Sequence, residues 1–267
     1  MEETIGQRED TLLQVRDVVV RFGGLLALDR VCFDVAQGEI RGLIGPNGSG
    51  KTTLFNCISN IYRPDSGEIR LGGERISGLP RHRMRRLGLG RTFQNVALFA
   101  TMTVQDNILV GAHHLGRTGF LAGSLGLPSA RREEREASDR LQPLLDLMDL
   151  RSSADAVVAE LPFPTQKRVE LARALIGAPR LLLLDEPAAG LNYEEVEVLG
   201  ALIRRIRERF GISILLVEHH MNLVMTVSDR VVALEFGRKI ADGLPEEVQN
   251  DREVIRAYLG ETEAQAA

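Results

Sequence analysis

The chain has 267 residues, of which 44% are apolar and 26% charged, and its formal net charge is -4. A chain of this length can form one large domain or two small lobes with a full core, and its charge gives no reason to expect a nucleic-acid partner. Cys32 and Cys57 belong to no paired motif, which fits a reduced, cytosolic setting and argues against disulfides.

The first residues are acidic and polar, unlike a secretory signal, and the longest apolar runs are far too short to cross a bilayer. We therefore expect a soluble chain that is linked to a membrane only through other subunits. One local cluster is basic, and it comprises Arg81, Arg83, Arg85, Arg86 and Arg91. A solvated face is the simpler interpretation of this cluster, and contact with an acidic partner or with lipid headgroups is the alternative.

The first part of the chain alternates short β-like segments with turns, after a flexible polar tail at residues 1–10. Strands are expected at residues 12–15, 18–20, 31–35, 39–44 and 68–71. From residue 104 to residue 150 the pattern is mainly helical. A Gly/Ser/Pro-rich stretch at 118–128 interrupts it, and a charged helix follows at 130–150.

Helices and continuous apolar strands alternate after residue 166. The expected order is helix 166–176, strand 181–184, helix 194–210, strand 212–217, helix 221–227 and strand 231–235. Continuous apolar strands between helices indicate a parallel sheet that is covered on both faces. The sequence thus predicts an α/β core that is interrupted by a helical lobe.

The most informative motif fits Gly-x-x-x-x-Gly-Lys-[Ser/Thr] and lies between the apolar run 40–44 and a helix-compatible segment. Glycines at these positions let successive backbone N–H groups point at a polyphosphate, and the helix N-terminus adds positive potential. Lys51 is expected to reach the β- and γ-phosphates of a nucleoside triphosphate, and the Thr52 hydroxyl to ligate Mg2+. The predicted nucleotide contacts are Gly45, Pro46, Asn47, Gly48, Ser49, Gly50, Lys51, Thr52 and Thr53.

A second motif is the run of four leucines that ends in Asp185 and Glu186. A buried parallel strand brings Asp185 to the carboxyl edge of the sheet, where it can hold Mg2+ directly or through water. Glu186 follows it and can accept the proton of a water that attacks the γ-phosphate. An acidic strand-to-loop turn without this role is the alternative, which the neighbouring phosphate-loop motif disfavours.

With these motifs in this order, the chain resembles the ATP-binding cassette of ABC transporters, from about residue 12 to residue 259. The resemblance implies a P-loop NTPase (RecA-like) core with a parallel sheet, an antiparallel β subdomain and an inserted α-helical subdomain. It divides the chain into a tail (1–10), the first part of the nucleotide-binding lobe (11–95), a helical subdomain with the signature region (96–165), the second part of the lobe (166–245), and a C-terminal helix and tail (246–267).

Three more positions match the family. Gln94 is similar to the glutamine that contacts Mg2+ and the attacking water, His219 to the histidine that contacts the γ-phosphate, and Phe22 to the aromatic residue that stacks on adenine. Taken alone, Gln94 is any loop glutamine and Phe22 is a core residue. A metal pair formed by His219 and His220 is disfavoured, because neighbours on a strand point to opposite faces.

Two positions depart from the family. Asn192 replaces the usual aspartate of the D-loop, and the signature Leu-Ser-Gly-Gly-Gln aligns with residues 161–165, where Pro162 has no hydroxyl and Pro164 no N–H. We hypothesise that the site built on this chain's own phosphate loop hydrolyses ATP, using the partner's signature. The site that borrows residues 161–165 would hydrolyse weakly or mainly hold the dimer closed. A proline that merely fits a helix start is the alternative.

Several segments resemble one subgroup, the ATPase subunits of branched-chain amino acid importers. They are residues 21–27, 90–94, 185–192, 217–221 and 254–260. The resemblance implies a second, non-identical cassette, two membrane-spanning permease subunits, an external substrate-binding protein, and a peripheral position on the cytoplasmic face of the inner membrane. Importers of urea or short amides have similar cassettes and remain an alternative, as does a regulatory cassette with weak hydrolysis.

The loop at Gln94 and the helical lobe that follows it would carry movement to the permeases. Phe99 and Phe120 are either partner-facing or core residues, and the sequence does not decide between them. An ABC-type ATPase that works on DNA or ribosomes is disfavoured, since the chain has neither long heptad arms nor a tandem second cassette. A small-molecule kinase would leave residues 161–173 unexplained.

Overall fold

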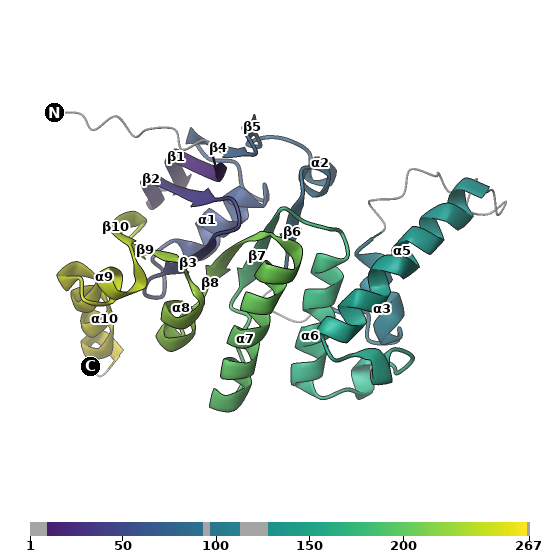
Figure 1. Cartoon of the computed structure of the whole chain (residues 1–267). Coiled ribbons are helices and arrows are strands. Elements are labelled where there is room, and N and C mark those ends of the chain that lie inside the picture. Colours follow the sequence, from purple (N-terminus) through teal and green to yellow (C-terminus); the bar gives the residue numbers. More distant parts are fainter. Residues whose placement is uncertain (1–9, 93–96, 113–127, 266–267) are drawn as a thin grey trace.

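The computed structural model describes residues 10–92, 97–112 and 128–265 (Figure 1). No helix among these residues is both long and apolar enough to span a membrane. The strands are β1 (Thr11–Phe22), β2 (Leu25–Ala36), β3 (Ile40–Ile44), β4 (Ser66–Leu71), β5 (Glu74–Arg75), β6 (Leu89–Arg91), β7 (Leu181–Asp185), β8 (Ser213–Val217), β9 (Arg230–Glu235) and β10 (Arg238–Gly243). The helices are α1 (Lys51–Ile58), α2 (Arg81–Arg86), α3 (Val104–Val110), α5 (Pro128–Leu147), α6 (Phe163–Leu175), α7 (Tyr193–Phe210), α8 (Met221–Val227), α9 (Pro245–Gln249) and α10 (Arg252–Gln265), with 3-10 turns at Arg151–Ser153 and Val158–Glu160.

An antiparallel sheet with the order β2–β1–β4–β5 forms the upper layer in Figure 1. The sequence predicts two short strands where β1 is one strand of 12 residues, so this expectation is wrong. Asp17 has a φ of 47° and the pairing with β2 shifts register between Val15 and Val18. This bulge breaks the alternation of buried and exposed residues, while the backbone pairing continues past it.

The second sheet has the order β10–β9–β3–β8–β7–β6. Adjacent strands of this sheet are parallel, except that β10 is antiparallel to β9. Every residue of β3, β7 and β8 is buried. The predicted parallel sheet with two covered faces is therefore confirmed, and it explains why these strands are continuous apolar runs.

Alternate residues of the buried strands face two different cores. In β7, Leu182 and Leu184 belong to the core that α6, α7 and α8 complete. Leu181 and Leu183 belong to the core formed with α1 and the antiparallel sheet. Figure 1 shows this layering, with α7 and α8 below the sheet and the antiparallel layer above it. Both cores together fix the carboxyl edge of the parallel sheet.

The helical lobe consists of α3, α5 and α6, and α3 packs against the other two helices. Asn107 of α3 fixes the segment that precedes this helix. It is fully buried, and its side chain exchanges hydrogen bonds of 2.8 and 3.0 Å with the backbone of Phe99. The Phe99 side chain itself is 50% exposed, so it is not a core residue. Phe120 lies outside the described residues. Helix α6 begins at Phe163 and therefore runs across the expected subdomain boundary at residues 165 and 166.

Candidate nucleotide-binding site

The loop between β3 and α1 follows the predicted phosphate-loop motif. Gly45, Gly48 and Gly50 have φ angles of 150°, 76° and 102°, a region that favours glycine. A Cβ on Gly45 would lie 2.2 Å from the carbonyl oxygen of Leu234, and one on Gly50 would lie 2.8 Å from that of Ala27. Around Gly48 a Cβ would meet no atom within 4 Å. The loop is thus packed against the sheet on one side and open on the other.

Polar groups of this loop point back into it. The Lys51 ammonium donates to the carbonyl oxygens of Gly45 at 2.6 Å and Pro46 at 2.8 Å. The Ser49 hydroxyl is buried and has no hydrogen-bond partner among the described residues. Asn47 and Thr52 are exposed, and Thr53 is half-buried. A cradle with an inward lysine and an unpaired buried hydroxyl has the donors that a polyphosphate requires.

Asp185 ends β7 and forms an ion pair with Arg91 at the end of β6, where an Arg91 nitrogen lies 3.0 Å from its Oδ2. The same guanidinium donates to Asn56 at 2.9 Å and to the Ser59 hydroxyl, and it lies 4.9 Å from the centre of the Phe55 ring. Burial raises the pKa of the Asp185 carboxyl, and the neighbouring Arg91 acts in the opposite direction. Arg91 thus helps to keep a desolvated carboxylate ionised.

Glu186, the next residue, is held in a left-handed backbone conformation with a φ of 46°. Its N–H donates to the carbonyl of Val217 at 2.9 Å, which joins the ends of β7 and β8. Its Oε2 lies 4.0 Å from Nδ1 of His219, whose side chain is 52% exposed. A non-glycine residue in this conformation is strained, and such strain clusters at functional sites. The structure thus brings Glu186 and His219 together.

His219 and His220 follow β8 rather than belonging to it, because the strand ends at Val217. Their rings lie side by side, with centres 4.6 Å apart. The sequence argument that strand alternation separates the two rings is therefore wrong. Ligand atoms of Glu218, His219 and His220 lie within 4.8 Å of one another, but both Glu218 oxygens already accept backbone N–H groups.

Comparison with known proteins gives two matching families. Residues 28–189 match the ABC transporter family, and residues 238–264 match the branched-chain amino acid ATP-binding cassette transporter family. The chain belongs to the ABC transporter family. As the geometry of the loop and the family together indicate, this cassette is an ATPase.

Among curated relatives, the cassette is 46% identical over 250 residues to the high-affinity branched-chain amino acid transport ATP-binding protein BraF of Pseudomonas aeruginosa, covering 94% of this chain and 98% of BraF. It is 45% identical to the LivG protein of Escherichia coli, which bears the same description, with the same coverage. Among solved structures, the ADP conformation of the ATP-binding cassette MJ1267 matches with a TM-score of 0.82 at 29% identity, covering 94% of this chain and 99% of that one. The predicted family and fold class are confirmed.

Phe22 of the cassette lies at the end of β1 and is 45% exposed, which excludes the alternative that it is a core residue. Its ring meets the ring of Tyr62 edge-on at 5.4 Å between centres. Phe22 thus combines an edge-on contact to Tyr62 with the exposure that stacking on a base requires. Gln94 lies outside the described residues.

The degenerate signature forms the first turn of α6. Pro162 is its N-cap, and Phe163 is 42% exposed. The Phe163 ring contacts Gly190, where a Cβ would lie only 3.0 Å from Cε1, and the ammonium of buried Lys167 lies 5.5 Å from the ring centre. Pro164 has no N–H, but N–H groups in the first turn of a helix have no partner within the helix. Proline at this position therefore removes no hydrogen bond of α6.

Asn192 has a local structural role that the sequence did not reveal. Its side chain accepts from the N–H of Glu195 at 3.0 Å, and the Glu195 carboxylate accepts from the N–H of Asn192 at 2.8 Å. This capping box starts α7. Because Asn and Asp are equally good N-caps, the replacement of aspartate costs the helix nothing.

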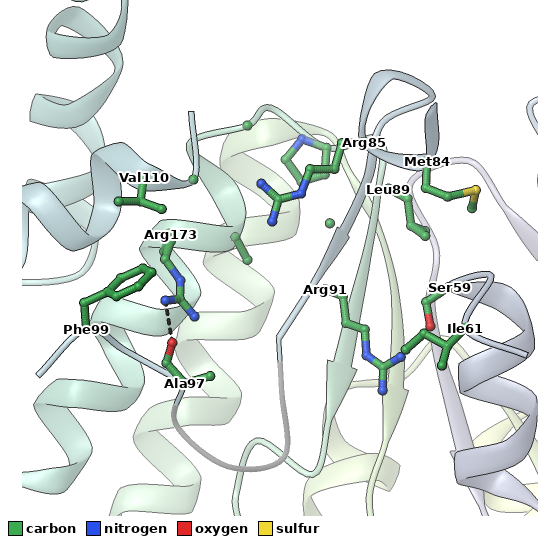
Figure 2. Close-up of a pocket in the computed structure, with 15 residues that line it drawn as sticks. Ser59, Ile61, Met84, Arg85, Leu89, Arg91, Ala97, Phe99, Val110 and Arg173 are labelled. Carbon is green, nitrogen blue, oxygen red and sulfur yellow. Dashed lines mark hydrogen bonds between the residues drawn. The ribbon is translucent and has the colours of Figure 1, made fainter. Parts of the chain in front are cut away.

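A pocket of about 420 Å³ opens between the nucleotide lobe and the helical lobe of the cassette (Figure 2). Arg85, Arg91 and Arg173 line it, and Arg173 donates to the carbonyl of Ala97 at 2.6 Å. Burial lowers the pKa of Arg173. The pocket also has apolar walls, formed by Ile61, Met84, Leu89, Phe99 and Val110. It combines three cations with an apolar lining.

Proposed function

We propose that this cassette is the ATP-binding and ATP-hydrolysing subunit of an importer of branched-chain amino acids. The observation that carries the proposal is the meeting of the phosphate loop, Asp185, Glu186 and His219 at the carboxyl ends of β3, β7 and β8, which are neighbours in one parallel sheet. Relatives named as branched-chain amino acid transport proteins match it at 45 and 46% identity over nearly their whole length. The match of residues 238–264 favours this substrate over urea or short amides.

The phosphate loop would bind the triphosphate of ATP. Its open side at Gly48, the buried Ser49 hydroxyl and the inward Lys51 ammonium supply donors for phosphate oxygens. Lys51 would exchange its two carbonyl partners for the β- and γ-phosphates. Phe22 would stack on adenine, a contact worth about 1–3 kcal/mol.

Thr52, Asp185 and Gln94 would hold Mg2+, which supplies neutralising charge on the β- and γ-phosphates when bound. The exposed Thr52 hydroxyl and the Asp185 carboxylate are hard oxygen ligands of the kind that this ion requires. Arg91 occupies one carboxylate oxygen of Asp185 and so restricts the orientation of the other.

Glu186 would accept the proton of the attacking water, and His219 would contact the γ-phosphate. The 4.0 Å between Glu186 Oε2 and His219 Nδ1 supports a joint action on one group between the two loops. The strained φ of Glu186 fixes its side chain at the end of β7, and the Val217 carbonyl holds that backbone in place.

The partners would be a second, non-identical cassette, two permease subunits and an external substrate-binding protein that acts through the permeases. The cassette would then be peripheral, on the cytoplasmic face of the inner membrane. The pocket between the lobes would receive a permease segment with apolar side chains and a carboxylate, because its walls are apolar and its three cations are arginines.

The test is uptake of labelled leucine, isoleucine, valine and urea in cells that lack this chain. These cells would carry wild type, Glu186→Gln, or Glu197→Gln, a control at an exposed position of α7. We expect uptake of the three amino acids to return with wild type and the control alone. The purified Glu186→Gln protein should bind ATP like wild type, while its turnover falls about 100-fold or more.

Three results would contradict the proposal. Unchanged amino acid uptake in the deletion strain, in a background without other branched-chain transporters, would reject the substrate. Restored uptake with Glu186→Gln would reject Glu186 as the base. A selective loss of urea uptake would move the cassette to the urea importers.

A further inference from the structure

Glu218 is a fully buried carboxylate that the proposed hydrolysis does not use. It follows β8 directly, and its side chain has 0% exposure. A charged group without solvent needs compensating hydrogen bonds, since the cost of burying it unpaired is large. Its partners therefore indicate what the residue does.

Its hydrogen-bond donors in the described part of the chain are backbone N–H groups of the two loops that hold Glu186 and His219, and its Oε2 also lies 3.9 Å from Nδ1 of the His219 ring. Oε1 accepts from the N–H of Ala188 at 2.7 Å. Oε2 accepts from the N–H of His219 at 3.1 Å and from that of His220 at 3.4 Å. One carboxylate thus connects the loop after β7 with the loop after β8.

This connection lies beside a second one. The N–H of Glu186 donates to the carbonyl of Val217 at 2.9 Å. Glu186 precedes Ala188 by two residues on one loop, and Val217 directly precedes Glu218 on the other. The Val217 carbonyl holds only the near end of the loop after β7, and Glu218 holds it past Pro187. Hydrogen bonds to an ionised acceptor are stronger than those between neutral groups, so Glu218 is suited to fix this geometry.

We propose that Glu218 is a positioning residue that fixes the relative placement of Glu186 and His219 by tying together the two loops that carry them. This inference rests on the proposed function of those two residues. A neutral glutamine of the same shape presents one oxygen and one NH2 group. In one of the two loops, a backbone N–H would then meet the NH2 group of glutamine, which cannot accept a hydrogen bond. That loop would lose its hydrogen bond to residue 218.

The test compares Glu218→Gln with Ser213→Ala in the full-length protein. Ser213 is a matched control at the opposite end of β8, because it is fully buried and its hydroxyl makes two hydrogen bonds to backbone, from Gly38 at 2.8 Å and to Ala36 at 3.0 Å. The first readout is amide hydrogen exchange in peptides that cover residues 186–191 and 217–222. We expect exchange at Ala188 or at His219 to accelerate about tenfold or more in Glu218→Gln only.

The second readout is steady-state ATPase kinetics. The Glu218→Gln variant should lose about tenfold or more in kcat while its KM for ATP stays within about twofold, because the loops move but the phosphate loop does not. In a His219→Ala background, the same change should cost less than in wild type, since the two residues act as one unit.

Unchanged exchange in both peptides would overturn the proposal, and so would equal losses in kcat and in ATP affinity, or full additivity with His219→Ala. The exchange measurement needs no hydrolysis. If wild type hydrolyses no ATP, the proposed function fails, while accelerated exchange in Glu218→Gln would still support the connection between the loops.

Discussion

At the scale of single residues, the site depends on backbone positions that only glycine fits and on charges that are paired inside the protein. Gly45 has a φ of 150° and no room for a Cβ beside the Leu234 carbonyl. Arg91 and Asp185 are only 14 and 7% exposed at their side chains, and their ion pair replaces the water that both lose. Because of these features, a substitution at Gly45 or at Arg91 should destabilise the folded protein more than the change in side-chain size suggests.

Gly45→Ala should unfold the phosphate loop or the whole protein. The new Cβ would lie 2.2 Å from backbone, and backbone strain of about 1–3 kcal/mol adds to this clash. Gly38→Ala is the control, because Gly38 also has a positive φ, 74°, yet no atom lies within 4 Å of its Cβ position. Urea unfolding should show a clearly larger loss of stability for Gly45→Ala. Equal losses would show that the clash is relieved.

Arg91→Met should lower the free energy of unfolding by about 3–5 kcal/mol at neutral pH, because it leaves Asp185 buried and charged. Burial already raises the pKa of this carboxyl in the folded protein, and Arg91 counteracts the rise. Without Arg91 the folded-state pKa rises further above the unfolded value. The loss of stability should therefore shrink as the pH falls through the raised folded-state pKa, where Asp185 takes up a proton. Unfolding curves between neutral and acidic pH test this, and a pH-independent loss would contradict it.

At the scale of elements, the start of α6 is the main departure from the family pattern. Pro162 caps the helix and Pro164 lies in its first turn, where prolines are well tolerated. The helix N-terminus still offers N–H groups and a positive dipole end to an anion. The hypothesis of two unequal ATP sites therefore remains a prediction. The predicted difference between the sites depends on the start of α6, and not on the phosphate loop.

Pro164→Gly tests the two unequal sites. We expect a small loss of stability, about 0.5–1 kcal/mol, since glycine adds freedom to the unfolded chain. We also expect a higher ATPase rate of the assembled transporter, because an N–H and a flexible turn return to the signature position. Pro245→Gly is the control, as Pro245 likewise lies in the first turn of a helix, α9. If Pro164→Gly leaves both ATPase rate and transport as in wild type, the hypothesis is wrong.

At the scale of the whole molecule, two lobes meet at a pocket whose cations come from both. Arg85 and Arg91 belong to α2 and β6, and Arg173 belongs to α6 of the helical lobe (Figure 2). Arg91 also pairs with Asp185, so one side chain reaches from this pocket to the proposed metal ligand. A partner that fills the pocket would thereby contact a residue of the nucleotide site.

Arg85→Glu should weaken assembly with the permease subunits, because it places a carboxylate where we expect the partner's carboxylate. ATP binding by the purified cassette should stay unchanged. Arg209→Glu, at an exposed position near the end of α7, is the control for added negative charge. Co-purification with the permeases and amino acid uptake are the measurements. Assembly that is equal in both variants would exclude a carboxylate at this position.

The sequence by itself determined the phosphate loop, the acidic pair at the end of β7 and the parallel sheet. Each has a local signal, because a loop that turns at several residues needs glycines and a strand with two buried faces needs a continuous apolar run. The same local signal failed at β1, where the bulge at Asp17 divides one strand into two apparent ones.

Only the tertiary structure decided how these segments are connected. The pair of Arg91 and Asp185 spans 94 positions, and the bond from Ala188 to Glu218 spans 30. The adjacent rings of His219 and His220 depend on where β8 ends. Such contacts arise from the register of neighbouring parallel strands and from the loops at their ends. They leave no periodic pattern in the sequence, because hydrogen bonds to backbone constrain geometry rather than the succession of residue types.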